Sequence, residues 1–430
     1  MRPLQRLGHA PTTFPLLLSL LSGALPATRA GDLPGNYSTW MATSIMSRSQ
    51  GVLGGPGDAS QLLQAGFTQK AFHQLLSTSA RNDALSDSLA AYVQRSVDSV
   101  TSVLANASHD TAYPLDRLSS GDALLRAYAD TGNASYGAAL AALQTSVGLQ
   151  PRNAAGGLWY YVYPNWSYLD GMYSYAPFSA AYATQHGGAL RPAAANITHQ
   201  LDLLWAHCYD AATGLLVHGY DDAKTAVWAD PVTGASPHVW GRSLGWYAMA
   251  LVDTLETLQG PLVGAGVDAG AWRHLHDRFG TLAGAIARAA DPATGGWWQV
   301  LDAPGREGNY VESSGSAMLA YALLKGVRLG FLGGGFSTGG AGNTSGSESV
   351  GNASYVDVAS RAYQYVAETF VVNDGNGTLG YNGTVSVCSL NSTASYDYYV
   401  GQPILYNSVL GSAAFVLASL EYERLAAASS

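Results

Sequence analysis

Runs of small and apolar residues, each preceded by a loop rich in aromatic and charged residues, recur along the chain. Five of these runs have the length of a helix and begin near residues 115, 168, 240, 311 and 407. Small residues occupy nearly every face of such a helix, so neighbouring helices can approach it closely and bury it on most sides. A sixth run of this kind is STWMATSIMSR, near Trp40. Together these runs predict the inner helices of an all-α protein.

More ordinary amphipathic stretches alternate with these runs and predict an outer layer of helices. They cover about residues 86–106, 134–147, 192–207, 271–290 and 355–370. Only short pieces near Trp159 and Trp297 could form β-hairpins, and these pieces lie in connections. The alternation predicts a closed ring of helix pairs, an (α/α)6 barrel, with the polar N-terminal ends of the inner helices at one mouth. A helical-repeat solenoid is the alternative, but no fixed sequence period recurs.

The first thirty residues predict a secretory signal peptide. Arg2 and Arg6 precede an apolar run at residues 14–25, and small residues end at Ala30. Residues 330–354, which are almost entirely Gly, Ser, Thr and Asn, predict a flexible surface insertion, and the Gly- and Gln-rich residues 49–66 predict an elaborated loop. Neither segment is long enough to separate two domains, so we expect residues 31–430 to form one domain.

The composition limits the classes of molecule that the protein is expected to bind. Hydrophobic residues make up 47% of the chain and charged residues 12%, which allows a large core. The chain has 21 Lys and Arg against 30 Asp and Glu, a net charge of −9, and no basic cluster, so we expect no nucleic-acid partner. No run after the first thirty residues predicts a membrane span, and we expect a secreted monomer. The 26 Tyr and 10 Trp suit either sugar faces or a core.

Two counts agree with export. Ten N-x-S/T sequons predict a glycosylated eukaryotic surface, and they begin at Asn36, Asn106, Asn133, Asn165, Asn196, Asn343, Asn352, Asn376, Asn382 and Asn391. Cys208 and Cys388 are the only two cysteines. An oxidising compartment permits one disulfide between them, and two buried free thiols are the alternative.

Carboxylates stand at the heads of the predicted inner helices. Asp170 follows YPNWSYL and precedes GMYSYAPF, and a carboxyl group surrounded by aromatic rings should have the raised pKa that a general acid needs. Asp116 repeats this arrangement one inner helix earlier, and Glu312 does so further along. Two carboxylates at one mouth are the usual equipment of a glycosidase. Helix capping is the alternative role for each of them.

The segment WGRSLGW offers a site for a carboxylate ligand. Arg242 lies between Trp240 and Trp246, where a guanidinium could hold a carboxylate while the indoles pack on a sugar ring. A structural ion pair with Asp116 or Asp221 is the alternative. His218, in TGLLVHGYD, could hold a water molecule or a substrate oxygen, or could be structural.

Other chemistries have no support in the sequence. His218, Asp221 and Asp222 match no compact metal-binding spacing, so we expect no metal. The sequence also has no GxSxG, phosphate loop or dinucleotide fingerprint, and we expect no cofactor.

Five segments, in order, resemble glycoside hydrolase families 88 and 105, the unsaturated glucuronyl and rhamnogalacturonyl hydrolases, and family 105 more closely. They are YPLDRLSSGDALLRAYADTGNASY, QPRNAAGGLWYYVYPNWSYLDGMYSYAPF, TGLLVHGYDDAK, HVWGRSLGWYAMALVDTLE and GNYVESSGSAMLAYALLKGVRLG. The resemblance implies an (α/α)6 barrel. It also implies removal of a terminal 4,5-unsaturated uronic acid from lyase-generated acidic oligosaccharides, such as pectin fragments.

The resemblance also implies roles for single residues. It makes Asp170 the acid/base and Asp116 the second essential carboxylate, with His218 and Arg242 binding the uronate and water. Trp240, Trp246, Trp159 and Tyr160 would complete the substrate pocket. The chain departs from many relatives at Tyr160, where they have His after the Trp, and this puts substrate preference in doubt.

Three alternatives remain at this stage. A β-glucuronyl hydrolase acting on other polysaccharide fragments would use the same mechanism. A sugar-binding protein without turnover would not need both Asp116 and Asp170. A glycosidase for saturated sugars on the same barrel is the third.

Overall fold

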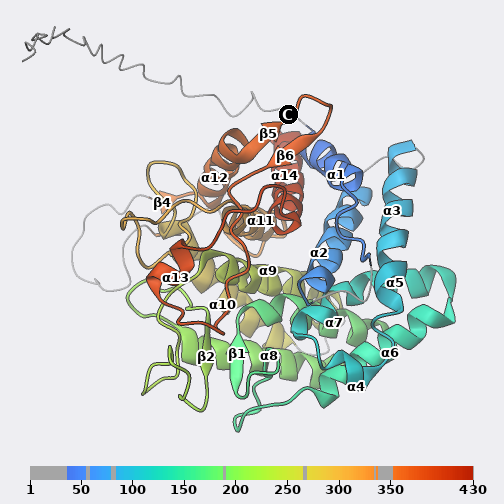
Figure 1. Ribbon diagram of the computed structural model, residues 1–430, viewed down its shortest axis with the longest axis horizontal. Helices are drawn as coiled ribbons and strands as arrows, with labels where there is room; N and C mark the ends of the chain where they lie inside the picture. Colours follow the sequence, from blue (N-terminus) through green and yellow to red (C-terminus); the bar gives the residue numbers. More distant parts are fainter. Residues whose placement is uncertain are drawn as a thin grey trace, which may run out of the picture. The chain divides into compact units, whose positions relative to one another are not determined.

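The computed structural model describes residues 36–54, 59–78, 84–186, 190–264, 269–333, 336–337 and 352–429. They belong to one unit, Gly35–Ser430, in which two layers of helices alternate along the chain (Figure 1). The predicted signal peptide lies outside the described residues, as does most of the predicted Gly/Ser insertion. In the part of the chain described, no helix is long and apolar enough to cross a membrane.

The inner layer is a closed ring. Its members are α2 (Ala59–Leu76), the 3-10 turn η1 (Leu115–Ser120) with α5 (Gly121–Thr131), α7 (Asp170–His186), α9 (Gly241–Leu258), α11 (Ser313–Arg328) and α14 (Val409–Ser429). Each member contacts the next, and α14 returns to contact α2. The predicted (α/α)6 barrel is therefore confirmed.

The outer layer covers this ring with one helix for each inner member. The outer helices are α1 (Tyr37–Ser47), α3 (Ala84–Thr101), α6 (Ala134–Leu149), α8 (Leu190–Cys208), α10 (Ala269–Arg288) and α12 (Tyr355–Phe370). The amphipathic stretches predicted this layer except for α1. Shorter helical elements in the connections are α4 (Ala107–Asp110), η2 (Gln259–Gly264) and α13 (Tyr396–Val400).

Small residues bring the inner helices together, as the sequence indicated. A Cβ atom on Gly121 of α5 would lie 2.1 Å from the Phe178 ring, and one on Gly245 would lie 2.9 Å from Met318 Cβ. In α9 every residue from Gly241 to Leu255 is buried. Because such a helix has no solvent-facing stripe, its position in the inner layer follows from its composition.

The sixth inner helix is not where the sequence analysis placed it. The segment near Trp40 forms α1, which belongs to the outer layer and packs on α14. The sixth inner helix is α2 instead, and its first half lies in the segment that was interpreted as a loop. Gly66 explains the error, because a Cβ there would lie 2.2 Å from Ser119 Oγ. Its lack of a side chain therefore serves close packing of α2 against η1 rather than a turn.

The strands among the described residues are short and lie in the connections. β1 (Trp166–Tyr168) pairs antiparallel with β2 (Gly219–Asp221), and β5 (Val371–Asn373) pairs with β6 (Leu379–Tyr381). β3 (Phe336–Ser337) pairs with β4 (Asn352–Ala353). The β1–β2 ladder matters most for the site, because its Tyr168 end leads directly into α7.

Candidate active site

A cavity of about 190 Å³ lies where the N-terminal ends of inner helices meet. Asp116 is on η1, Asp170 is the first residue of α7 and Arg242 is the second residue of α9. The connection that precedes α13 completes the wall. The lining includes Tyr160, Tyr163, Tyr168, Trp240, Trp246, Cys388 and Ser389. The predicted polar and aromatic mouth is present, with both carboxylates in it.

The β1–β2 ladder places Asp170 beside His218. Tyr168 pairs with Gly219, and one residue further along the Leu169 backbone N–H donates to the His218 carbonyl, with 3.1 Å between the atoms. His218 Nε2 lies 3.2 Å from Asp170 Oδ2, although the two are not aligned as a hydrogen bond. His218 is completely buried and does not line the cavity, so any role in the reaction would be exerted through Asp170.

Two hydroxyl groups complete this cluster. Ser243 Oγ donates to Asp170 Oδ2 at 2.5 Å, and the Tyr399 hydroxyl lies 2.8 Å from His218 Nδ1. The Tyr399 backbone carbonyl accepts from Gln299 Nε2 at 3.0 Å, which fixes the residue. If the Tyr399 hydroxyl donates to Nδ1, the hydrogen of the neutral imidazole resides on Nε2, facing Asp170.

Asp116 is buried more deeply than Asp170 and has a perturbed pKa. Its Oδ2 accepts from the Tyr160 hydroxyl at 2.7 Å, whereas Oδ1 is buried without a hydrogen-bond partner among the described residues. The pKa of Asp116 is raised to about 7, chiefly by burial; the Tyr160 hydrogen bond opposes the rise and the charge of Asp170 adds to it. A carboxyl group with this pKa can carry its proton near neutral pH.

Tyr160, the departure from many relatives, is therefore a partner of a candidate catalytic carboxylate. Its ring stacks on Tyr168 with 4.3 Å between ring centroids and 14° between planes. Burial raises the pKa of the Tyr160 phenol well above its usual value, as do the charges of Asp116 and Asp170. The phenol consequently remains a neutral hydrogen-bond donor to Asp116.

Arg242 lines the cavity, but most of its hydrogen bonds serve the fold. Nη1 donates to the Val385 carbonyl and Nη2 to the Ser386 carbonyl, both at 2.6 Å. Its ion-pair partner is Glu312, 3.9 Å away, rather than Asp116 or Asp221. The guanidinium also lies 4.7 Å from the Trp240 ring centroid. These contacts hold the 385–386 connection against the cavity wall, so binding of a substrate carboxylate by Arg242 stays a prediction.

The predicted tryptophans differ in position. Trp240 and Trp246 line the cavity; the Trp240 indole donates to Gln299 Oε1 at 3.1 Å, and Trp246 packs on Tyr173 with 4.4 Å between ring centroids. The structure does not bring Trp159 to this cavity. The next residue, Tyr160, lines the cavity instead.

Glu312 takes the capping role that the sequence left open. Its Oε2 accepts from the Gly315 backbone N–H at 2.6 Å, at the head of α11, and its Oε1 accepts from the Val385 backbone N–H at 3.0 Å. Both oxygens also accept from Ser314 Oγ. Glu312 is thus a structural carboxylate that connects α11 to the cavity wall.

The acidic residues near His218 have structural contacts as well. Both Asp221 oxygens accept hydrogen bonds, from the backbone N–H groups of Ala223, Thr225 and Ala226. Within the described ranges, no group of three or more His, Cys, Asp or Glu residues is arranged to hold a metal ion.

The predicted disulfide between Cys208 and Cys388 is wrong in this structure, where both thiols are free and buried. Cys208 ends α8 in the outer layer and is completely buried. Cys388 lies in the cavity wall, where Gln299 Nε2 is 3.7 Å from its sulfur. The two cysteines therefore belong to different parts of the barrel. Burial raises the pKa of the Cys388 thiol to about 12.

Sequence reasoning missed Ser243, Tyr399 and the connection that carries Cys388. Ser243 follows Arg242 in the quoted WGRSLGW segment, so a polar residue facing Asp170 could have been suspected there. Tyr399 is 181 residues from its partner His218, and a single sequence gives no signal for that pairing.

Comparisons with known proteins agree with this geometry. The family model of Glycosyl Hydrolase Family 88 matches residues 64–338 and 346–426. Protein Atu3128 of Agrobacterium fabrum is 36% identical over 217 residues, which are 49% of this chain and 82% of that protein. A 24.9 kDa protein in the picA locus of Rhizobium radiobacter matches equally well.

A solved structure extends the similarity to nearly the whole chain. The family 105 glycoside hydrolase of C. acetobutylicum ATCC 824 is 31% identical, with a TM-score of 0.75, over 90% of this chain and 99% of that one. The unsaturated glucuronyl hydrolase of Bacillus sp. GL1 shares the fold, with a TM-score of 0.55 and 14% identity over 91% of this chain and 96% of that one. With two carboxylates in an aromatic mouth and these matches, the chain belongs to the glycoside hydrolases of families 88 and 105.

Proposed function

We propose that this glycoside hydrolase removes a terminal 4,5-unsaturated uronic acid from short acidic oligosaccharides, with unsaturated pectin fragments as its substrates. The observation that carries the proposal is the pair Asp116 and Asp170 in one cavity, the first with a pKa of about 7. The names of structural neighbours, unsaturated glucuronyl hydrolases among them, point to the same class of substrate.

The chemistry consists of hydrating a double bond. A carboxylic acid transfers a proton to C4 of the enol ether, and water adds at C5 while the carboxylate accepts a proton from that water. The resulting hemiketal opens, which leaves a ketone at C5 and a hemiacetal at C1. The bond between C1 and the glycosidic oxygen then breaks, and the neighbouring sugar leaves with that oxygen. The products are an open-chain keto-uronate and a shortened oligosaccharide. Because attack is at C5, the carboxylate separation that distinguishes retaining from inverting enzymes does not apply.

We assign the delivery of that proton to Asp170. Ser243 donates to Oδ2 and His218 lies against the same oxygen, so the proton available to a ligand resides on Oδ1. The side chain is 11% exposed, which is enough to meet a ligand while most bulk water is excluded. His218 and Ser243 fix the orientation of the carboxyl group, as a general acid requires.

Asp116 contributes a neutral carboxyl group below a pH of about 7. The substrate carries its own carboxylate on C5, and a second ionised carboxylate in a small buried cavity would repel it. A protonated Asp116 avoids this repulsion, and its proton can be donated to a substrate oxygen. The buried Oδ1 has no partner among the described residues, so a proton on it is not engaged by another protein group.

The proposal can be tested with matched pairs of disaccharides. Each pair has an unsaturated uronate, made by a polysaccharide lyase, and its saturated counterpart. Loss of the ultraviolet absorbance of the conjugated uronate reports turnover of the first, and reducing-sugar release reports turnover of both. We expect turnover of unsaturated substrates alone, fastest for rhamnogalacturonan and pectin fragments. Fastest turnover of glucuronyl disaccharides from other polysaccharides would replace the pectin assignment, and equal cleavage of saturated sugars would refute the mechanism.

We also propose that the protein is exported and glycosylated, on the strength of its N-terminal sequence and its sequons. Asn36, Asn106, Asn133, Asn376, Asn382 and Asn391 are exposed, and the cap at Asn106 uses Oδ1, which leaves Nδ2 for a glycan. Asn196 is the exception, because its Nδ2 donates to the Tyr175 hydroxyl at 2.8 Å. Intact mass before and after glycosidase treatment of protein from a eukaryotic host tests this proposal.

A further inference from the structure

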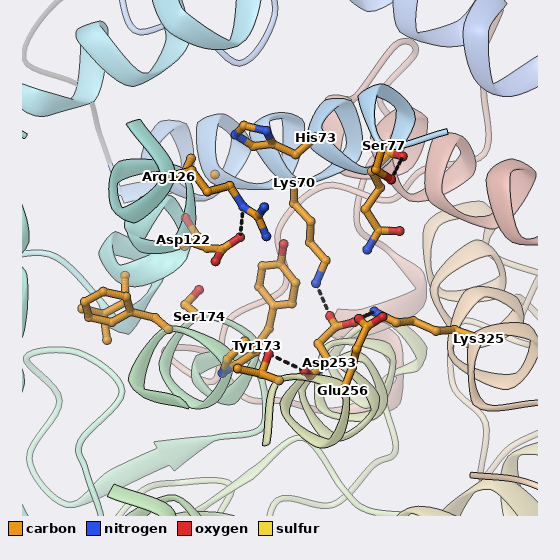
Figure 2. A pocket seen from close by; sticks show the side chains of 18 of the residues that line it. Lys70, His73, Ser77, Asp122, Arg126, Tyr173, Ser174, Asp253, Glu256 and Lys325 are labelled. Carbon is orange, nitrogen blue, oxygen red and sulfur yellow. Dashed lines mark hydrogen bonds and ion pairs between the residues drawn. The ribbon is translucent and has the colours of Figure 1, made fainter. Parts of the chain in front are cut away.

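A second and larger cavity, about 480 Å³, lies at the other end of α9 and α11. Whereas the first cavity meets the beginning of α9, the second is lined by Asp253 and Glu256 from the C-terminal half of α9 and by Lys325 from the last turn of α11 (Figure 2). Lys70 of α2 and Tyr173 of α7 project into the same region. The family reaction uses none of these residues.

The positive charges around this cavity outnumber the negative charges. Asp253 accepts from both Lys70 and Lys325, and Lys325 also lies 2.6 Å from Glu256 Oε2. Arg328 and Arg424 share the buried Glu421, and Arg126 pairs with Asp122 at 3.1 Å. Five cationic side chains thus meet four carboxylates. Nη1 and Nη2 of Arg126, whose side chain is 56% exposed, have no partner among the described residues, and the Lys70 side chain is 20% exposed.

Uncharged polar groups around the cavity also lack partners. Ser174 is 2% exposed and lines the cavity, yet its hydroxyl makes no hydrogen bond in the described part of the chain. The same is true of His73 Nε2 and Gln74 Oε1, which belong to lining residues on α2. Buried polar groups in folded proteins nearly always have a partner, so three unpartnered groups on residues that line one cavity are an unusual concentration.

Tyr173 adds an aromatic face and a free acceptor. Pro177 has no backbone N–H, so the Tyr173 carbonyl lacks the usual i→i−4 helical hydrogen bond. The Tyr173 ring lies 5.1 Å from Lys70 Nζ. On its other side the ring packs on Trp246, which lines the first cavity. The packed rings of Tyr173 and Trp246 therefore connect the linings of the two cavities.

We propose that the second cavity binds a small hydroxylated carboxylate, a monosaccharide acid. The excess cation and the free Arg126 nitrogens suit one carboxylate group. Exposed acceptors such as the Glu256 carboxylate would repel a phosphate, because a phosphate at neutral pH has at most one hydroxyl to donate. The same acceptors can accept hydrogen bonds from the hydroxyl groups of a sugar. The Tyr173 ring suits a sugar face. The volume lies within the range of small-molecule sites.

Isothermal titration calorimetry with D-galacturonate, D-galactose and inorganic phosphate tests the proposal. The proteins are the wild type, Arg126→Ala, Ser174→Ala and the control Arg273→Ala, which removes an exposed arginine of α10. Ser174→Ala is informative because removing a hydroxyl that has no protein partner should leave thermal stability unchanged or raised. Neither cavity variant should alter turnover at saturating substrate.

We expect D-galacturonate to bind the wild type and the control, and the affinity to fall by about ten-fold or more in each cavity variant. If galacturonate also binds the first cavity, two binding events should appear in the wild type, and only one should be weakened. The proposal is overturned if no binding heat is seen, if both cavity variants bind galacturonate as the wild type does, or if galactose or phosphate binds equally well.

Discussion

Replacing Asp116 by Asn should change how stability depends on pH. The structure gives Asp116 a pKa of about 7, against an ordinary value of 3.8, because the carboxyl group is buried and faces Asp170. Below pH 4 the group is protonated in both the folded and the unfolded protein. Between pH 4 and 7 the unfolded chain loses this proton while the folded chain keeps it. The wild type should therefore lose stability as the pH rises through this window, with no further loss from this group above it.

The magnitude follows from the displacement of the pKa. At about 1.36 kcal/mol for each pH unit, the difference between 3.8 and 7 corresponds to about 4 kcal/mol. This is an upper estimate, because a buried site can relax or admit water once charged. Asn cannot ionise and has nearly the same shape, so Asp116→Asn should lack this contribution. Relative to the wild type, the variant should gain roughly 2–4 kcal/mol between pH 4 and pH 8.

Urea unfolding at a series of pH values, followed by tryptophan fluorescence, measures this difference directly. The matched control is Asp130→Asn, which removes an exposed carboxylate at the end of α5. The control should follow the wild-type curve, whereas Asp116→Asn should diverge from it above pH 4. Parallel curves for all three proteins would show that Asp116 ionises normally, and the neutral-carboxyl role would then have no basis.

Three further predictions concern other residues. Tyr399→Phe leaves the buried His218 Nδ1 without a hydrogen-bond partner, which costs about 1–3 kcal/mol. We therefore expect kcat to fall about ten-fold and the pH profile of kcat to move, while KM changes little. An unchanged pH profile would assign Tyr399 to the fold alone. Arg242→Lys cannot serve both backbone carbonyls, so we expect a loss of about 1–3 kcal/mol in unfolding free energy, and an unchanged melting temperature would contradict this. Unfolded, unreduced protein should react with thiol reagent at both Cys208 and Cys388, whereas a disulfide would leave neither thiol reactive.

The sequence was sufficient for the barrel because the inner helices have a distinctive composition. Small residues on all sides mark a helix that is buried all round, and this holds for α9, in which Gly245 approaches Met318. The same logic failed for α2, where Gly66 was taken as a sign of a loop. Glycine permits both turns and close helix contacts, and a single sequence does not distinguish the two.

The candidate site was predictable where its residues lie in the matching motifs or at helix heads, and not elsewhere. Asp116, Asp170 and Tyr160 are brought to one cavity as expected. Arg242 was less accurately anticipated, because its main partner, Val385, is 143 residues away in an irregular connection. Contacts between such distant loops depend on the completed fold, so the sequence pattern could suggest a charge at the mouth but not its partners.

The Asp170→Asn variant tests the central claim, that Asp170 protonates the substrate double bond, most directly. Its rate should be followed by loss of the ultraviolet absorbance of an unsaturated rhamnogalacturonan disaccharide, with binding measured separately by calorimetry. Asp170→Ala should accompany it, because an Asn before Gly171 can deamidate back to Asp. We predict that kcat falls by at least about 100-fold in both variants, while the folded protein melts normally and still binds substrate. A near-wild-type rate in the Asp170→Ala variant would contradict the assignment of Asp170 as the proton donor.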